Sequence, residues 1–323
     1  MAKYLVTGGC GFIGSHLVDK LLSDGHRLVV IDDLSTGKKE NISGNVELII
    51  ADIRNKGVFD DVLKSVDGVF HLAAIASVME SVTNWRFTHE VNATAIVNLY
   101  EAISNSDKNI PVVYASSAAV YGDSESFPFR ESLNVEPISA YGADKYACEL
   151  YSRVANKVHS IPSIGLRFFN VYGSRQDPSS PYSGVISIFA EKVLSGDDVI
   201  IFGNGKQARD FIYVDDVVRA IILSMEKMVR GKAGFDVYNV CAGKITTINQ
   251  LLDVVESVAN VSVNRIHESS RKGEVKISYG DGSRAVSEIG FKSSVSLEEG
   301  LKSTMEYINN VRAKNLFLNK NAV

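Results

Sequence analysis

Short apolar runs and longer segments with apolar residues at helical spacing alternate through the first half of the chain. The first run, residues 4–6, is followed by a glycine-rich turn, after which residues 13–22 carry apolar side chains three and four positions apart. This order predicts a buried strand, a tight turn and a helix packed back on the strand. A second apolar run, residues 28–31, ends at Asp32. Strand, glycine turn, helix and strand are together typical of the first unit of a dinucleotide-binding fold.

The same rhythm continues along the chain. Further strands are predicted at residues 46–51, 68–74, 111–116 and 163–168, and helices at residues 58–66, 87–104 and 144–160. Strands that alternate with helices predict an α/β fold, a doubly wound parallel Rossmann sheet that binds its ligands at the carboxyl ends of the strands.

The pattern is less regular after residue 173. A loop rich in serine, proline and glycine is predicted at residues 173–184, and then a helix at 185–194, a strand at 198–202, an extended segment that becomes helical at 211–225, a strand at 236–240, and helices at 247–259 and 297–308 with a polar tail. We therefore predict a Rossmann domain over residues 1–172, to which residues 207–243 return. A smaller α/β substrate-binding lobe is predicted from residues 173–206 and 244–323.

Three glycines in the first turn are spaced by three residues. Gly8 would permit a sharp turn, Gly11 would allow a pyrophosphate to approach the backbone, and Gly14 would let the helix and strand touch. The N-terminus of the helix would then face the phosphates. A glycine cluster alone marks only a turn, so the prediction depends on the whole unit.

Asp32 decides the expected cofactor. An acidic residue about 20 positions after the glycine turn suits the ribose hydroxyls and repels a 2′-phosphate, so NAD is favoured over NADP. The alternative is that Asp32 belongs to an ordinary turn. Asp52 and Ile53, after the third strand, are placed to meet an adenine ring, and the small residues up to Ala74 would let the backbone lie close to the cofactor.

Composition narrows the class of protein. The chain has 323 residues and a net charge of −4, which gives no reason to expect nucleic acid or a membrane surface as a partner. Cys10, Cys148 and Cys241 are scattered without the spacing of metal ligands, so no metal site is predicted. With no signal peptide visible at the N-terminus, we expect a cytoplasmic protein.

The candidate chemistry follows the fifth strand. Tyr141 and Lys145 lie four residues apart, on one face of a predicted helix. An ammonium group and a positive nicotinamide ring beside a phenol favour the phenolate, which makes Tyr141 a general base for an alcohol or sugar hydroxyl. Ser117 could hydrogen-bond the same oxygen. A pair with this spacing can also be purely structural.

With these residues in place, the sequence resembles the extended short-chain dehydrogenase/reductase superfamily, and within it the UDP-sugar 4-epimerases of the UDP-galactose and UDP-N-acetylglucosamine 4-epimerase type. The resemblance extends to about residue 305. It rests on TGGCGFIG at 7–14, DDLSTG at 32–37, ADI at 51–53, HLAA at 71–74, SSAAVYG at 116–122, YGADK at 141–145, RFFNVYG at 167–173, RDFIYVDD at 209–216 and RKGE at 271–274.

The resemblance implies a reaction. NAD would stay bound and be recycled while Tyr141 takes the proton from the hydroxyl at carbon 4. The 4-keto sugar would then rotate about its diphosphate linkage and receive the hydride on its other face. Lys145 would hold the nicotinamide ribose, and Ser117 would bond the reacting oxygen.

The resemblance also implies binding residues. Those expected at the cofactor are Gly8, Gly11, Phe12, Ile13, Gly14, Asp32, Asp33, Ser35, Gly37, Asp52, Ile53, Leu72, Ala73, Ala74, Asn92, Ser116, Tyr141, Lys145 and Phe168. Those expected at the UDP-sugar are Ser77, Ser117, Tyr141, Asn170, Val185, Arg209, Arg271, Glu274 and Ser278. The two arginines suit phosphate because guanidinium grips it with two hydrogen bonds, although most arginines form surface ion pairs.

Two features narrow the substrate. Related dehydratases have an Asp-Glu pair after the residue matching Ser117, and related decarboxylases have a Glu there, whereas this chain has Ala118 and Ala119. Elimination or decarboxylation would lose its proton-transfer group, but epimerisation needs none. A position that is bulky in epimerases limited to unacetylated hexoses matches Ser278, which favours interconversion of UDP-GlcNAc and UDP-GalNAc. A shift of one residue, to Tyr279, would reverse that inference.

Several alternatives remain open. They are a UDP-glucose/UDP-galactose 4-epimerase, a UDP-glucuronate 4-epimerase, for which Arg175 is a conceivable extra cation, an NADPH-dependent 4-keto-sugar reductase, and a non-catalytic NAD-binding regulatory protein. The helices predicted at residues 87–104 and 144–160 resemble those that pair in family dimers, so a homodimer is expected. Supply of polysaccharide precursors would fit an acetyl-sugar epimerase.

Overall fold

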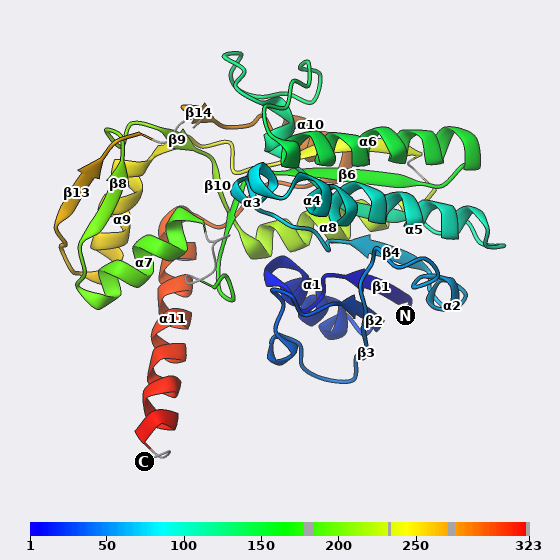
Figure 1. Cartoon of the computed structure of the whole chain (residues 1–323), viewed down its shortest axis with the longest axis horizontal. Helices are drawn as coiled ribbons and strands as arrows, with labels where there is room; N and C mark the ends of the chain where they lie inside the picture. The colour runs from blue at the N-terminus through cyan, green and yellow to red at the C-terminus, as the bar shows by residue number, and fades with distance from the viewer. Residues whose placement is uncertain (178–183, 232–233, 271–274, 321–323) are drawn as a thin grey trace.

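A seven-stranded parallel sheet forms the centre of the computed structural model, which describes residues 1–177, 184–231, 234–270 and 275–320 (Figure 1). The strands follow the order β11-β6-β5-β4-β1-β2-β3. Their bounds are β1 Lys3–Thr7, β2 Arg27–Asp32, β3 Glu47–Ile50, β4 Gly68–His71, β5 Val112–Ser117, β6 Ser163–Phe168 and β11 Phe235–Val240. The chain reverses its direction of travel across the sheet between β1 and β4, which is where a doubly wound fold binds its ligand. The predicted fold class is confirmed.

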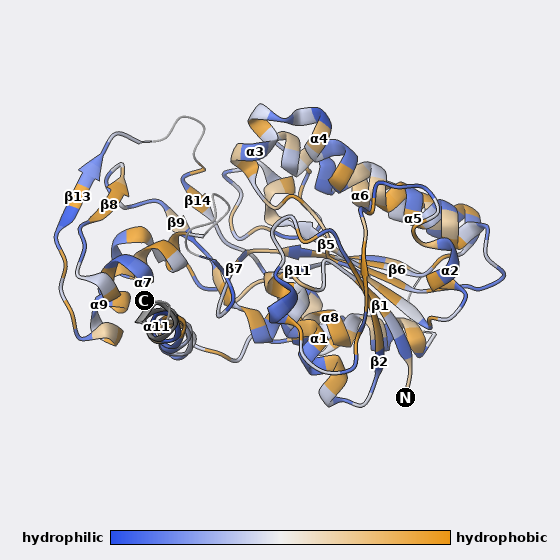
Figure 2. Cartoon of the chain, turned by 60° about the horizontal axis from the view of Figure 1, so that its bottom comes forward, coloured by the Kyte–Doolittle hydropathy of each residue, from blue (hydrophilic) through white to orange (hydrophobic). Residues whose placement is uncertain are grey.

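Helices cover both faces of this sheet. Successive residues of a strand point to opposite faces, so apolar side chains are buried on both. Val6 packs with α1 (Phe12–Ser23) and α8 (Val214–Val229), and its neighbour Leu5 packs on the other face with α5 (Ala95–Ser104) and α6 (Ala140–His159). Figure 2 shows the strands lying between these two helical layers.

A second group of elements has its own hydrophobic core. The helices α7 (Val185–Ser195), α9 (Ile248–Ala259) and α11 (Leu297–Lys320) pack together around it. Small strands border it: β7 Asn170–Tyr172 with β10 Phe211–Tyr213, β8 Val199–Phe202 with β13 Arg265–Glu268, and β9 Ala208–Arg209 between β12 Thr246–Thr247 and β14 Ile277–Ser278. The division into two domains stays a prediction, although β11 does pair with β6 in the large sheet.

Several helices differ from their predicted bounds. The helix expected at 58–66 is only α2 (Asp60–Leu63), and the helix expected from residue 144 begins at Ala140, where Ser139 caps it by accepting the Gly142 N–H. The helix expected at 87–104 begins as α4 (Trp85–His89) and passes through the π-helical η2 (Glu90–Thr94) before α5. The structure adds α3 (Val78–Thr83), capped by Ser77, and the 3₁₀ turns η1 (Lys39–Asn41) and η3 (Ala118–Tyr121).

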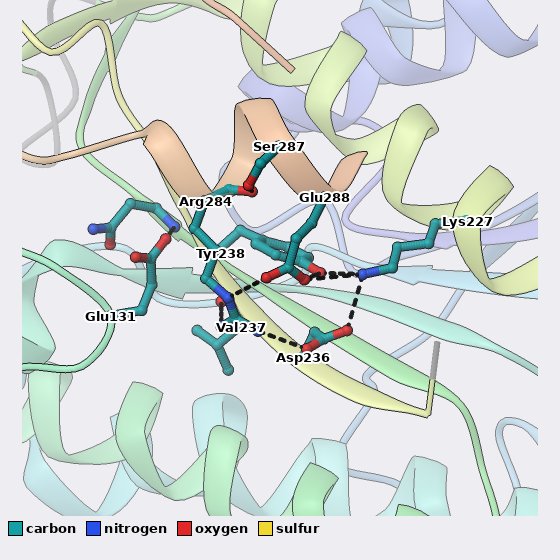
Figure 3. Close-up of polar contacts among 9 residues, drawn as sticks. Glu131, Lys227, Asp236, Val237, Tyr238, Arg284, Ser287 and Glu288 are labelled. Carbon is teal, nitrogen blue, oxygen red and sulfur yellow. Dashed lines mark hydrogen bonds and ion pairs between the residues drawn. The ribbon is translucent and has the colours of Figure 1, made fainter. Parts of the chain in front are cut away.

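A charged cluster fastens two helices to the free edge of the sheet (Figure 3). Asp236 on β11 pairs with Lys227 of α8 at 3.1 Å and with Arg284 of α10 (Ser283–Ile289) at 2.8 Å. Glu288 accepts hydrogen bonds from both cations and from the Tyr238 hydroxyl. Burial acts to raise the pKa of Glu288, but these three donors outweigh it and lower the pKa to about 2. The carboxylate is therefore charged at any working pH.

Candidate active site

The turn after β1 and the loop after β4 lie against each other at the reversal point of the sheet. Gly8 has a φ of +70°, and a Cβ at this position would lie 2.7 Å from the Ala73 backbone nitrogen. Only glycine fits there, because a side chain would meet both backbone strain and a clash. The Thr7 hydroxyl accepts the Ala73 N–H at 3.2 Å, which holds the two segments together. The backbone at Ala73 thus lies against the glycine turn, and its close approach to the cofactor stays a prediction.

The beginning of α1 is open to an anion. Gly11 is its N-cap, no side chain caps it, and its first turn holds no acidic residue. A Cβ on Gly14 would lie 2.1 Å from the Gly8 carbonyl oxygen, so this glycine lets the helix fold directly onto the turn rather than onto the strand. Uncapped N–H groups at a helix N-terminus bind phosphate well. These residues therefore fit the pyrophosphate of a dinucleotide.

Asp32 ends β2 and is only 7% exposed. Its carboxylate accepts the backbone N–H of Cys10 and of Leu34, each at 2.9 Å. Burial raises the pKa of Asp32, and the two N–H groups act against this rise. Because each carboxylate oxygen can accept a second hydrogen bond, Asp32 can hold the glycine turn and still accept from a ribose hydroxyl. Asp33 accepts from the Ser35 N–H and hydroxyl beside it.

Three of the predicted cofactor residues use their side chains elsewhere. Asp52 forms an ion pair with Arg54, and the Asn92 amide both donates to and accepts from the backbone of Ile75. Ser116 donates to Glu149 at 2.6 Å and is 1% exposed. Each of these side chains is already bonded within the protein, and their contact with the cofactor stays a prediction. Ile53 is 5% exposed and packs in the core.

The three predicted catalytic residues are brought together by a close contact between η3 and α6. Ser117 is the last residue of β5 and caps η3 by accepting the Ala119 N–H at 3.1 Å. A Cβ on Gly142 would lie 2.6 Å from the Ala119 carbonyl oxygen, so this glycine lets η3 lie on the first turn of α6. Tyr141 belongs to that turn. Ser117 and Tyr141 therefore lie at the same edge of the sheet.

Lys145 lies one turn beyond Tyr141 and is 4% exposed. Its ammonium lies 5.9 Å from the centroid of the Tyr141 ring. Burial lowers the pKa of His71, at the end of β4, to about 3, and the charge of Lys145 adds to this effect. Lys145 therefore projects a positive charge toward the carboxyl ends of the central strands, and His71 is neutral at working pH.

Two predicted substrate residues lie on adjacent strands of the second group of elements. Arg209 on β9 and Ser278 on β14 are register partners, and the Asp210 N–H donates to the Ser278 carbonyl oxygen at 3.0 Å. The Tyr279 ring stacks on Phe127 with the centroids 5.7 Å apart. Arg271 and Glu274 lie outside the described residues.

The remaining described substrate residues of the prediction lie on three other elements. Asn170 is exposed on β7, Val185 is the first residue of α7, and Ser77 is 6% exposed at the cap of α3. Arg175 pairs with Asp19 on α1 and has a φ of +65°. The ion pair uses Nη2, whereas Nη1 is buried and has no hydrogen-bond partner among the described residues.

A sequence model of the "NAD dependent epimerase/dehydratase family" matches residues 4–241. The chain belongs to this family. This membership confirms the predicted superfamily and NAD as the cofactor. In Methanocaldococcus jannaschii a "putative UDP-glucose 4-epimerase" is 38% identical over 95% of this chain and 98% of its own length.

Two solved structures of the family are similar over nearly their whole length. The UDP-glucose 4-epimerase of Thermotoga maritima has a TM-score of 0.91 and 38% identity, over 96% of this chain and 99% of its own. The UDP-N-acetylglucosamine 4-epimerase of Methanobrevibacter ruminantium has a TM-score of 0.90 and 38% identity, over 96% and 98%. Each was solved with a UDP-linked sugar ligand.

Two absences apply to the described part of this family member. Within it, no helix is both long and apolar enough to cross a membrane. Nor do three or more His, Cys, Asp or Glu side chains there gather into a group that could hold a metal ion.

Some residues next to the site escaped the sequence prediction. Glu149 and Arg167 form a buried ion pair at 2.7 Å, and Arg167 also donates to the Tyr121 hydroxyl. The sequence did hold a signal for Glu149. Tyr141, Lys145 and Glu149 follow one another at intervals of four residues, which places them on one side of a helix. The partner Arg167 could not be identified from spacing because it lies on a different element, the strand β6.

Proposed function

We propose that this family member is a nucleotide-sugar 4-epimerase that inverts carbon 4 of a UDP-hexose and prefers UDP-GlcNAc and UDP-GalNAc. The observation that carries the proposal is the Tyr141–Lys145 pair at the same sheet edge as Ser117, with Ala118 and Ala119 where a carboxylate would serve elimination or decarboxylation. The names of the similar proteins from Thermotoga maritima and Methanobrevibacter ruminantium support the 4-epimerase class.

The protein's residues would divide the work as follows. Tyr141 removes the proton from the 4-hydroxyl as general base and returns it after the 4-keto sugar has rotated to present its other face. Lys145 stabilises the phenolate by its charge and holds the nicotinamide ribose. Ser117 donates a hydrogen bond to the oxygen at carbon 4, which keeps that oxygen beside Tyr141. The bound NAD supplies the hydride acceptor and donor for carbon 4.

The preference for acetylated sugars rests on Ser278. Residues in register on neighbouring strands project to the same face, so Ser278 lies beside Arg209, the proposed grip on the diphosphate. A serine there leaves room for an acetamido group. The neighbouring residue Tyr279 is the bulky one, and its ring stacks on Phe127. This contact supports Ser278, rather than Tyr279, as the residue beside the sugar.

The rival functions make different demands. A UDP-glucose/UDP-galactose epimerase would use the same machinery with a narrower sugar pocket. A UDP-glucuronate epimerase needs a cation for the carboxylate, and Arg175, the conceivable one, already pairs with Asp19. A 4-keto-sugar reductase would depend on added NADPH, against which Asp32 argues. A regulatory protein would not need Ser117, Tyr141 and Lys145 together.

The deciding experiment uses purified protein without added cofactor. UDP-GlcNAc and UDP-glucose are supplied in separate tubes, and the products are resolved by proton NMR. We expect conversion of both to their galacto epimers, with UDP-GlcNAc the faster. Activity only with added NADPH, or no product in either tube, would overturn the proposal.

A further inference from the structure

Five buried polar residues form one hydrogen-bonded chain behind the proposed catalytic serine. Glu149 of α6 is at its centre and accepts from the Ser116 hydroxyl at 2.6 Å. Arg167 of β6 donates to both oxygens of Glu149, at 2.8 and 2.7 Å. Arg167 also donates to the Tyr121 hydroxyl at 2.9 Å, which donates to the Asn239 side-chain oxygen at 2.6 Å. None of the five residues is more than 4% exposed.

One end of this chain lies beside the catalytic machinery. Ser116 precedes Ser117 on β5, and Ser116 and Arg167 are register partners on adjacent strands. Tyr141, Lys145 and Glu149 follow one another at intervals of four along α6, so they share one side of the helix. The bonds at Glu149 therefore fasten α6 to β5 and β6 on the side that carries the base and its lysine.

The other end reaches the proposed sugar pocket. The Asn239 amide nitrogen donates to the Phe129 carbonyl oxygen at 2.9 Å and to that of Asp281 at 3.3 Å. Phe129 in turn donates its N–H to the Tyr279 carbonyl oxygen at 2.9 Å. Ser278 precedes Tyr279. One continuous set of bonds thus runs from the residue beside Ser117 to the segment beside Ser278.

The chemistry of the chain favours a geometric role. A buried ion pair contributes little net stability because losing water offsets most of its attraction, but it tolerates few arrangements. Burial raises the pKa of Tyr121 to about 12, so its hydroxyl keeps its proton and its direction at working pH. The two bonds of the Tyr121 hydroxyl, to Arg167 and to Asn239, are therefore made by the neutral phenol.

We infer that Ser116, Glu149, Arg167, Tyr121 and Asn239 are positioning residues, which set the placement of Ser117 and the Tyr141 helix relative to the sugar pocket. This inference rests on the proposed function. Misplacing reacting groups by about 1 Å can cost about 100-fold in rate, whereas ground-state binding of the nucleotide depends on distant contacts. Loss of a link should therefore lower kcat more than it raises KM.

The test compares two pairs of matched variants in the NAD-loaded protein. Ser116→Ala and Tyr121→Phe each remove one link and leave the Glu149–Arg167 pair in place. Ser163→Ala and Tyr100→Phe are the controls, because both residues are buried in the same sheet-and-helix layer and are hydrogen-bonded there. The Tyr100 hydroxyl oxygen lies 3.1 Å from that of Ser163 and 2.7 Å from that of Ser152. For each variant the readouts are kcat and KM for the UDP-sugar, NAD content and Tm.

We expect kcat to fall about 10-fold to 100-fold in Ser116→Ala and Tyr121→Phe, with KM and NAD content near the wild-type values. The two controls should lose Tm to a similar extent but keep kcat. The inference is overturned when all four variants keep kcat, or when the controls lose as much kcat as the network variants. Should Tyr121→Phe fail to fold, Ser116→Ala decides alone, since it removes one hydroxyl only. An inactive wild-type protein would instead contradict the proposed function.

Discussion

Arg209 and Ser278 are register partners on two short parallel strands, β9 and β14, that lie next to each other. The backbone between them is well fixed, since the buried carboxylate of Asp210 accepts the N–H groups of Ala242, Gly243 and Gly280. Burial raises the pKa of Asp210 to about 6, and these N–H groups hold it down. A change of side-chain size at Ser278 should therefore alter the pocket without moving its walls.

Ser278→Tyr should restrict the enzyme to unacetylated sugars. We expect turnover of UDP-GlcNAc to fall at least about 10-fold, because the ring would occupy the space for the acetamido group, while turnover of UDP-glucose persists. Proton NMR of both reactions provides the ratio. Tyr279→Phe is the control and should leave that ratio unchanged. An unchanged ratio in Ser278→Tyr would remove the role given to this serine.

Tyr141→Phe should keep NAD and lose turnover. Removing a general base costs about 10²-fold to 10⁴-fold in rate, whereas the phenyl ring preserves the packing of the first turn of α6. Absorbance of the purified protein and denaturing release of the nucleotide measure the NAD content, and NMR measures turnover. Tyr151→Phe, on an exposed part of the same helix, should behave as wild type. Wild-type turnover in Tyr141→Phe would show that another group takes the proton.

The arrangement of the glycine turn and Asp32 was predictable because these residues are close in the sequence. Gly8, Gly14 and Asp32 lie within one strand-turn-helix-strand unit, and local spacing determines their placement. Tyr141 and Lys145 share a helical face for the same reason. The link from Ser116 to Glu149 spans 33 residues and depends on how α6 packs on β5, so no local pattern could reveal it.

Helix bounds were wrong where partners outside the helix decide them. The last predicted helix was expected to end at Ile308, where the apolar spacing ends, but α11 continues to Lys320. Arg312 on this extension donates to Glu191 of α7 at 2.7 Å, a contact that apolar periodicity does not detect. For α3, the pattern from Ser77 to Glu80 was a usable capping signal, and Ser77 does accept the Glu80 N–H at 3.0 Å.

Val154→Glu should produce a monomer if the expected homodimer forms through α6. Leu150, Tyr151, Val154 and Val158 are 42–67% exposed on one side of this helix. On the partner helix predicted at 87–104, Ile96, Leu99 and Ile103 are instead buried in the core. Its exposed apolar side chain is Phe87, and Met79, Val82 and Trp85 are exposed just before it. A charge within such a contact would be desolvated without a partner. Light scattering after size exclusion measures the mass, and Val286→Glu, 46% exposed on α10, is the control. Equal masses for Val154→Glu and the wild type would contradict this interface.

Glu288→Gln should destabilise the protein at neutral pH and much less in acid. The pKa of Glu288 is lowered from 4.5 to about 2 in the folded state, so its charge contributes stability above pH 4.5, and this contribution is lost as the pH falls toward 2. Urea unfolding at several pH values measures the difference in free energy of unfolding between variant and wild type. Glu226→Gln, which removes an exposed pair with Arg230, should show little difference at any pH. A Glu288→Gln difference that is the same at pH 3 and pH 7 would show that the charge is not the cause.

Gly8→Ala should abolish NAD binding, and Gly25→Ala should not. Both glycines have φ values near the left-handed region, +70° and +80°, so an alanine costs about 1 kcal/mol of backbone strain at either position. They differ in their surroundings, since a Cβ at Gly25 has nothing within 4 Å whereas a Cβ at Gly8 would lie 2.7 Å from Ala73 N. The extra clash must push the glycine turn and the loop after β4 apart, and both were predicted to touch the cofactor. Measuring the NAD content and the Tm of both variants separates backbone strain from the clash. If both variants lose a similar amount of Tm and both keep NAD, the close approach of Gly8 to Ala73 is not needed for binding.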